Sequence, residues 1–154
     1  GTGGALLKAL DGRPDYPMLV LNGDTYLNLD FSAFIDWYAQ RPVDFAVVLK
    51  EVDDASRYGS VTIDKSGAVI AFTEKGCTEA GLVNSGVYML KPSVLKQFSE
   101  SEKFSLEKDV LQRKIQSLKT GAYITTAYFI DIGIPTDYRR AQSELVSYVT
   151  VRRK

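Results

Sequence analysis

Two continuous apolar runs limit what this chain can fold into. Met18–Leu21 and Phe45–Leu49 contain only apolar residues, and polar or turn-forming residues bound both runs. A strand with one exposed face alternates apolar and polar side chains, whereas a strand buried on both faces is apolar throughout. Strands of the second kind belong to sheets that helices cover on both sides, which indicates an α/β domain.

The other segments predict helices and strands in alternation. The β-prone runs 60–64 and 68–72 are joined by a short loop containing Gly67, which is typical of an antiparallel hairpin. Asp30 and Ser105 are expected helix N-caps. We therefore predict one α/β or mixed-sheet domain, with helices at 5–10, 31–38, from 92, 105–115 and from 135, and strands at 18–21, 45–49, 60–64, 68–72, 86–90 and 123–130.

Composition restricts the classes of partner. The 154 residues are 45% hydrophobic and 25% charged, which suits one globular domain with a real core. Basic and acidic residues both number 19, so the net charge is zero and gives no basic surface for nucleic acid. No apolar run approaches the roughly 20 residues that span a bilayer, so we expect no membrane partner. The single cysteine, Cys77, permits no internal disulfide and favours a reducing, cytoplasmic location.

The chain contains no histidine. This excludes a Ser-His-Asp triad, a Cys-His pair and a histidine-ligated zinc site built from this chain alone. Carboxylates, lysine, arginine, hydroxyls and amides remain. Such groups suit hard cations such as Mg²⁺, and they suit phosphate.

Two aspartates occupy the ends of predicted strands. Asp24 follows the strand at 18–21, and Asp131 follows the strand that ends at Ile130. Ligands of α/β sheets gather outside the carboxyl ends of the strands, so these acids are candidates for one shared Mg²⁺ site. Each acid taken alone is equally compatible with ordinary turn chemistry.

Three further segments carry polar groups of interest. Glu74 and Lys75 follow the strand at 68–72, where they suit a sugar hydroxyl and a phosphate, or a solvated strand end. Asn84, before the next strand, suits a polyol or a turn. The glycine-rich start, residues 1–4, precedes a helical pattern and offers backbone amides to a nucleotide, although a glycine-rich start is weak evidence by itself.

In order along the chain, six segments resemble the sugar-1-phosphate nucleotidyltransferase family. The segments Leu-Asn-Gly-Asp-Thr and Tyr-Phe-Ile-Asp-Ile-Gly-Ile-Pro are most similar to those of guanylyltransferases that act on D-glycero-D-manno-heptose 1-phosphate. The guanylyltransferases of mannose 1-phosphate come next. The resemblance implies a Rossmann-like nucleotide-diphospho-sugar transferase fold with a mixed, mainly parallel sheet, flanking helices and one hairpin. The six segments are residues 1–6, 21–24, 57–59, 72–75, 83–88 and 129–138.

The resemblance also implies residue roles. By it, Mg²⁺ is held by Asp24 and Asp131, and Lys75 meets the sugar phosphate. The nucleotide, guanine by preference over cytosine, thymine or uracil, contacts Gly1, Thr2 and Gly3, and the sugar contacts Gly59, Glu74 and Asn84. The implied reaction joins a nucleoside triphosphate and a sugar 1-phosphate, for surface polysaccharide precursors. A homo-oligomer stays open.

The family signature Gly-x-Gly-Thr-Arg-Leu, followed by a Pro-Lys pair, does not occur in this sequence. In the family this loop binds the triphosphate. We therefore expect residues 1–154 to be the C-terminal part of a single nucleotidyltransferase domain, incomplete at the N-terminus and inactive by itself. Two other classes stay open: a metal-dependent glycosyltransferase, and a non-catalytic or regulatory module of the same fold.

Overall fold

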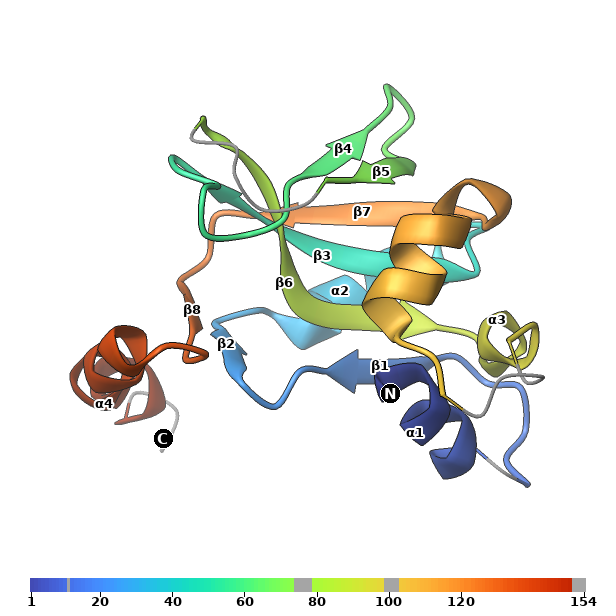
Figure 1. Ribbon diagram of the computed structural model, residues 1–154, viewed down its shortest axis with the longest axis horizontal. Helices are drawn as coiled ribbons and strands as arrows, with labels where there is room; N and C mark the ends of the chain where they lie inside the picture. Colours follow the sequence, from blue (N-terminus) through green and yellow to red (C-terminus); the bar gives the residue numbers. More distant parts are fainter. Residues whose placement is uncertain (11, 74–78, 99–102, 151–154) are drawn as a thin grey trace.

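The computed structural model describes residues 1–10, 12–73, 79–98 and 103–150, with side chains up to residue 148. At its centre lies a four-stranded sheet in the order β1-β6-β3-β7 (Figure 1). Strand β6 is antiparallel to β1 and β3, whereas β3 and β7 are parallel, so three of the four strands run in one direction. The mixed sheet of the sequence prediction is confirmed, with the strands β1 (Met18–Leu21), β3 (Phe45–Val52), β6 (Gly81–Leu90) and β7 (Thr120–Thr125).

Both faces of this sheet are buried, as the apolar run in β3 predicts. Phe45, Val47 and Leu49 belong to a core cluster on one face, while Ala46 and Val48 belong to a second cluster on the other. Side chains of a strand alternate between faces, so a continuous apolar run fills two cores at once. Helix α2 (Phe31–Ala39) covers the second face. Three helices cover the first face: α1 (Thr2–Ala9), α3 (Pro92–Lys96) and the π-type helix η1 (Leu106–Gln112). The short helix η2 (Ile115–Ser117) follows η1.

The predicted helix starts at Asp30, Pro92 and Ser105 are confirmed. The Asp30 carboxylate accepts a hydrogen bond from the Ala33 amide over 3.0 Å, and the Ser105 hydroxyl accepts one from the Lys108 amide over 3.2 Å. These bonds satisfy amides that have no partner within a helix's first turn. Helix α1 begins earlier than predicted and includes the glycines at its start.

The predicted strand at 123–130 is wrong, because the structure divides it in two. Strand β7 ends at Thr125, and a separate strand β8 (Phe129–Asp131) pairs with β2 (Thr25–Leu27), an element that the sequence analysis did not predict. The predicted strand at 86–90 begins five residues earlier, at Gly81. The hairpin is confirmed as β4 (Val61–Ile63) paired with β5 (Val69–Phe72).

Helix α4 (Pro135–Thr150) stands beside the ribbon of β2 and β8, away from the central sheet (Figure 1). The helix predicted from residue 135 is confirmed, and within it Ala141 is buried whereas Tyr138 is 54% exposed. Tyr26, Tyr128 and Tyr148 stack in a group that joins α4 to the ribbon, with 4.3 Å between the ring centroids of the last two. In the described part of the chain, no helix has the length and apolarity needed to cross a membrane.

Candidate functional site

The structure brings Asp24 and Asp131 together. Thr25 lies directly opposite Asp131 in the β2–β8 ribbon, and the carbonyl oxygen of Asp24 accepts a hydrogen bond from the Ile132 amide over 2.9 Å. Both aspartates line one open cavity of about 560 Å³. A shared metal site requires this proximity, and the ribbon, not the central sheet, produces it.

The two carboxylates retain oxygens for a ligand. Within the described residues, the Asp24 carboxylate has no hydrogen bond or ion pair, and its side chain is exposed. In Asp131, Oδ1 accepts a hydrogen bond from the Gly133 amide over 2.7 Å, which is the turn chemistry considered above, while Oδ2 is not used by that turn. Among the residues that the structure describes, no group of three or more acidic side chains is placed to hold a metal ion. The pair fits Mg²⁺, which commonly takes one or two protein carboxylates and fills its octahedron with phosphate oxygens and water.

A distortion of β6 places Asn84 in the same cavity. Between the pairs Val47–Tyr88 and Leu49–Asn84, β3 contributes one residue whereas β6 contributes three, so β6 bulges. The buried Ser85 hydroxyl donates a hydrogen bond to the Val48 carbonyl over 2.7 Å and so satisfies the strand opposite the bulge. The sequence predicts Asn84 just before a strand, and this is wrong. Asn84 lies inside β6.

Gly86 allows this bulge to approach the aspartates. Its φ of +76° lies in the left-handed region, and a Cβ there would lie 2.8 Å from both Asn22 Nδ2 and Thr25 Oγ1. A side chain at this position is both strained and obstructed. The glycine thus keeps the loop that carries Asp24 against the strand that carries Asn84.

A buried hydroxyl orients the Asn84 amide. Asn84 Nδ2 donates to the Tyr88 hydroxyl over 2.7 Å, and Asn84 Oδ1 accepts from the Gly86 amide over 3.0 Å. The Tyr88 hydroxyl in turn donates to Glu107 on η1 over 3.4 Å. Burial raises the pKa of the Tyr88 hydroxyl, which therefore stays protonated as a donor. One amide hydrogen and one oxygen lone pair of Asn84 remain for a polyol.

Sequence reasoning missed Glu107. It lines the first cavity and also a second cavity of about 680 Å³ beside it. Its position two residues after the Ser105 cap was visible in the sequence, but nothing there shows that η1 brings Glu107 beside Asp24 and Tyr88.

The predicted sugar-contacting Gly59 also lines the first cavity. A Cβ on Gly59 would lie 2.8 Å from the Thr73 carbonyl oxygen, so this wall has no room for a side chain. The predicted Glu74 and Lys75 lie outside the described residues. Their roles stay predictions, as do those of the other site residues.

The predicted nucleotide contacts Gly1, Thr2 and Gly3 separate into two groups. Thr2 lines the second cavity, and its hydroxyl accepts a hydrogen bond from the Leu106 amide over 3.0 Å. Gly1 and Gly3 instead pack against Phe104, where a Cβ on Gly3 would lie 2.1 Å from the Phe104 ring. The Gly3 amide already donates to the Phe104 carbonyl oxygen over 3.0 Å. These glycines permit α1 to pack closely on the chain before η1.

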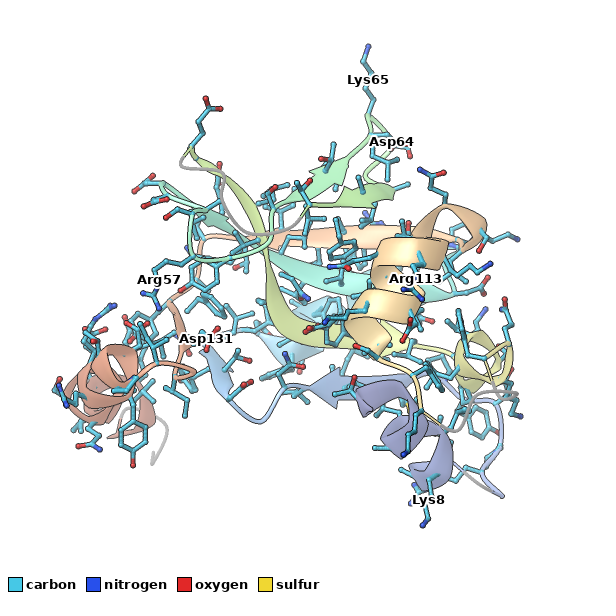
Figure 2. All side chains as sticks on the ribbon, viewed as in Figure 1. Lys8, Arg57, Asp64, Lys65, Arg113 and Asp131 are labelled. Carbon is cyan, nitrogen blue, oxygen red and sulfur yellow. The ribbon has the colours of Figure 1, made fainter. Side chains whose placement is uncertain are left out.

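Arg57 also lines the first cavity, on the same side of the molecule as Asp131 and α4 (Figure 2). Its guanidinium pairs with Asp137 of α4, whose side chain is 3% exposed, and Arg140 pairs with the same carboxylate over 2.9 Å. The hydrogen bond from Arg57 holds the pKa of Asp137 below its ordinary value, and Arg140 lowers the pKa further. Asp137 is therefore an ionised, enclosed link between α4 and the loop at residues 57–59.

Solved structures of other proteins share the fold of this chain. The crystal structure of HddC from Yersinia pseudotuberculosis matches with a TM-score of 0.81 and 40% identity, over 92% of this chain and 60% of that one, and a second structure of HddC is titled as a complex with GMP-PN. A putative glucose-1-phosphate thymidylyltransferase from Bacillus anthracis, at 20% identity and a TM-score of 0.74, shares the fold. The fold is thus the one that these solved structures share.

Sequence comparison identifies the family directly. Residues 1–147 match the family described as nucleotidyl transferase. A D-glycero-alpha-D-manno-heptose 1-phosphate guanylyltransferase of Aneurinibacillus thermoaerophilus is 40% identical over 97% of this chain, and one of Campylobacter jejuni is 39% identical over 90%. The chain belongs to the nucleotidyl transferase family. It spans 64% and 60% of the lengths of these two relatives.

Proposed function

We propose that this protein acts in the transfer of a guanylyl group from GTP to a sugar 1-phosphate, with a heptose or mannose 1-phosphate as the acceptor. The observation that carries the proposal is the proximity of Asp24 and Asp131, which line one cavity together with Gly59 and Asn84. The names of the relatives support the choice of guanine and of these sugars, because the curated relatives are heptose- and mannose-1-phosphate guanylyltransferases.

The two neighbouring cavities suit two substrates. In this proposal the sugar occupies the first cavity, where Asn84 presents an oriented amide and Gly59 leaves the backbone accessible. The nucleotide occupies the second cavity, beside Thr2. Asp24 lines both cavities, so a phosphate of each substrate can reach its carboxylate.

The chemistry needs no histidine. An anionic oxygen of the sugar 1-phosphate attacks the α-phosphorus of GTP, a new P–O bond forms, and the bond to the β-phosphate oxygen breaks as pyrophosphate leaves. The nucleophile is already deprotonated, so alignment and offset of charge are the demands on the protein. Asp24 and Asp131 would hold Mg²⁺, which supplies positive charge to the phosphate oxygens when bound. We keep Lys75 as the proposed partner of the sugar phosphate, and Glu74 as a sugar ligand.

The length of the chain matters for the test. It spans about 60% of the heptose-1-phosphate guanylyltransferases that it matches, and we propose that it forms the C-terminal part of a single nucleotidyltransferase domain. We expect residues 1–154 to bind substrates without turnover, because the triphosphate-binding signature of the family is absent from them. A cytoplasmic location suits the single cysteine and the proposed substrates.

The experiment combines binding on residues 1–154 with turnover on the natural protein at its full length. Calorimetric titration tests Mg²⁺ with GTP, mannose 1-phosphate and D-glycero-α-D-manno-heptose 1-phosphate, and a coupled assay measures pyrophosphate release. We expect pyrophosphate release that depends on a sugar 1-phosphate and on Mg²⁺. Turnover of GDP-mannose without pyrophosphate would instead indicate a glycosyltransferase, and binding without turnover at full length would indicate a non-catalytic module.

A further inference from the structure

The first cavity carries an excess of negative charge. Its described lining contains the carboxylates of Asp24, Glu107 and Asp131, and Arg57 is the one cation among the lining residues that the structure describes. A phosphate group entering this cavity would face a lining that holds three acids and one described cation, and like charges repel. A bound divalent cation offsets part of this repulsion, and the geometry of Arg57 offers a further positive charge.

Arg57 is fixed in place and is not a loose surface cation. Its guanidinium pairs with the enclosed Asp137 carboxylate, and its Cζ lies 5.6 Å from the centroid of the Tyr58 ring. The Asp137 carboxylate is itself held by Arg140 from the same helix. Three groups on two segments distant in sequence therefore determine where the guanidinium lies, which lowers the entropy cost of ordering a long side chain on binding.

The ion pair leaves most of the guanidinium available. A guanidinium carries five N–H donors, and the pair with Asp137 engages one of its terminal nitrogens. The Arg57 side chain is 45% exposed and also lines a small side cavity with Asp131 and Gly133. Its remaining donors can form the paired hydrogen bonds that arginine makes with phosphate oxygens.

We propose that Arg57 binds a phosphate oxygen of the sugar 1-phosphate, and that Asp137 acts as the residue that positions it. This inference rests on the proposed function and assigns part of its acceptor site. Arg57 shares its cavity with the proposed sugar contacts Gly59 and Asn84, and it does not line the second cavity, which Thr2 borders. The geometry thus favours the phosphate of the sugar over that of the nucleotide. Helix α4 then contributes to the acceptor site through Asp137 without contacting the substrate.

The test measures the affinity of the natural full-length protein for GTP with Mg²⁺ and for whichever of mannose 1-phosphate and the heptose 1-phosphate the wild type binds more tightly. We expect Arg57→Gln to weaken sugar 1-phosphate binding about 10-fold or more, since a charge-assisted hydrogen bond is lost. GTP affinity should stay unchanged, and Arg57→Lys should recover part of the loss. Arg139→Gln is the matched control and should leave both affinities unchanged, because it removes an exposed cation of the same helix but no group that lines either cavity.

Asp137→Asn tests the positioning role. It should weaken sugar 1-phosphate binding by less than Arg57→Gln does, and the double variant should be no worse than Arg57→Gln alone. A purely structural role for Asp137 would instead lower the affinities for sugar phosphate and GTP together. Thermal unfolding of each variant accompanies the titrations. Arg57 is half-exposed, so Arg57→Gln should fold and still test the phosphate contact even if Asp137→Asn does not fold.

Three outcomes would overturn the inference. If Arg57→Gln weakens GTP binding and not sugar 1-phosphate binding, the nucleotide is the partner of Arg57. If Arg57→Gln changes neither affinity while Asn84→Ala weakens sugar 1-phosphate binding, the inference fails and the proposed function survives. If the wild-type protein at its natural full length binds neither sugar 1-phosphate nor GTP with Mg²⁺, the proposed function fails and the inference fails with it.

Discussion

The carbonyl oxygen of Asp24 accepts a hydrogen bond from the amide of Ile132 over 2.9 Å. This bond extends the β2–β8 pairing by one step beyond the Thr25–Asp131 pair. The backbone pairing therefore fixes the separation of the two main-chain positions from which the Asp24 and Asp131 side chains extend. Two acids separated by more than a hundred residues in sequence thus become neighbours through a short ribbon that lies outside the central sheet.

This relationship predicts that the two aspartates act as a unit. Asp24→Asn or Asp131→Asn, made in the natural full-length protein, should each lower turnover roughly 100-fold and weaken Mg²⁺ dependence, since each removes a charged ligand of the proposed metal. The double variant should be little worse than either single one. Pyrophosphate release against Mg²⁺ concentration provides the measurement.

The matched control for these variants is Asp36→Asn. Asp36 is exposed on α2, which covers the other face of the sheet, so the same substitution there should leave turnover unchanged. Near-normal turnover and metal response in either site variant would remove that aspartate from the proposed metal site.

Much of the central sheet could be predicted from sequence, for a local reason. The apolar run at Phe45–Leu49 requires two buried faces whatever the topology, and Asp30 and Ser105 cap helices through contacts three residues away. Such signals depend on near neighbours in the chain. Asp24 and Asp131 lie beside one another in the β2–β8 ribbon and not at the edge of the central sheet, and their role in holding a metal stays a prediction.

The ribbon and the bulge could not be predicted because their causes are distant in sequence. Residues 123–130 have uniform β propensity, and the division after Thr125 exists because β8 finds its partner in β2. Asn84 lies within β6 because the Ser85 hydroxyl satisfies a carbonyl of β3, 37 residues away. Likewise, no sequence signal pairs Arg57 with Asp137, since 80 residues separate them.

The bulge predicts that Gly86 tolerates no side chain. Gly86→Ala should destabilise the chain by more than the roughly 1–2 kcal/mol that a left-handed φ costs an L-residue, because the Cβ also meets Asn22 and Thr25 at 2.8 Å. Gly67→Ala isolates the first cost, as Gly67 has a φ of +83° with open space around its Cβ position. Urea unfolding of both variants gives the two losses of stability. Equal losses would mean that Asn22 and Thr25 move away from the new Cβ without a cost in free energy, which would contradict the prediction.

The Tyr88 hydroxyl predicts a contrast with Tyr38. Tyr88→Phe should cost about 1–2 kcal/mol of stability and weaken sugar 1-phosphate binding, because the Asn84 amide loses the acceptor that orients it. Tyr38→Phe should be neutral or stabilising, since the buried Tyr38 hydroxyl has no hydrogen-bond partner within the described structure. Unfolding in urea and calorimetric titration provide the two readouts. Similar effects of both substitutions on sugar phosphate affinity would contradict a specific role for Tyr88.

The Asp137 link predicts a distinctive loss of stability in acid. Hydrogen bonding from Arg57 and the charge of Arg140 hold the pKa of Asp137 below its ordinary value in the folded chain, while burial acts in the other direction. A group whose pKa is lower when folded contributes its full stabilisation above its unfolded pKa, about 4 for aspartate, and loses that stabilisation as the pH falls through the folded pKa.

Wild type should therefore exceed Asp137→Asn in stability by roughly 1–3 kcal/mol at neutral pH, and the gap should narrow below about pH 4. Urea unfolding of both proteins across this range gives the difference directly. Because an uncharged asparagine has nothing to protonate, a gap that stays constant into acid would mean that the Asp137 carboxylate is not the ionised partner of Arg57.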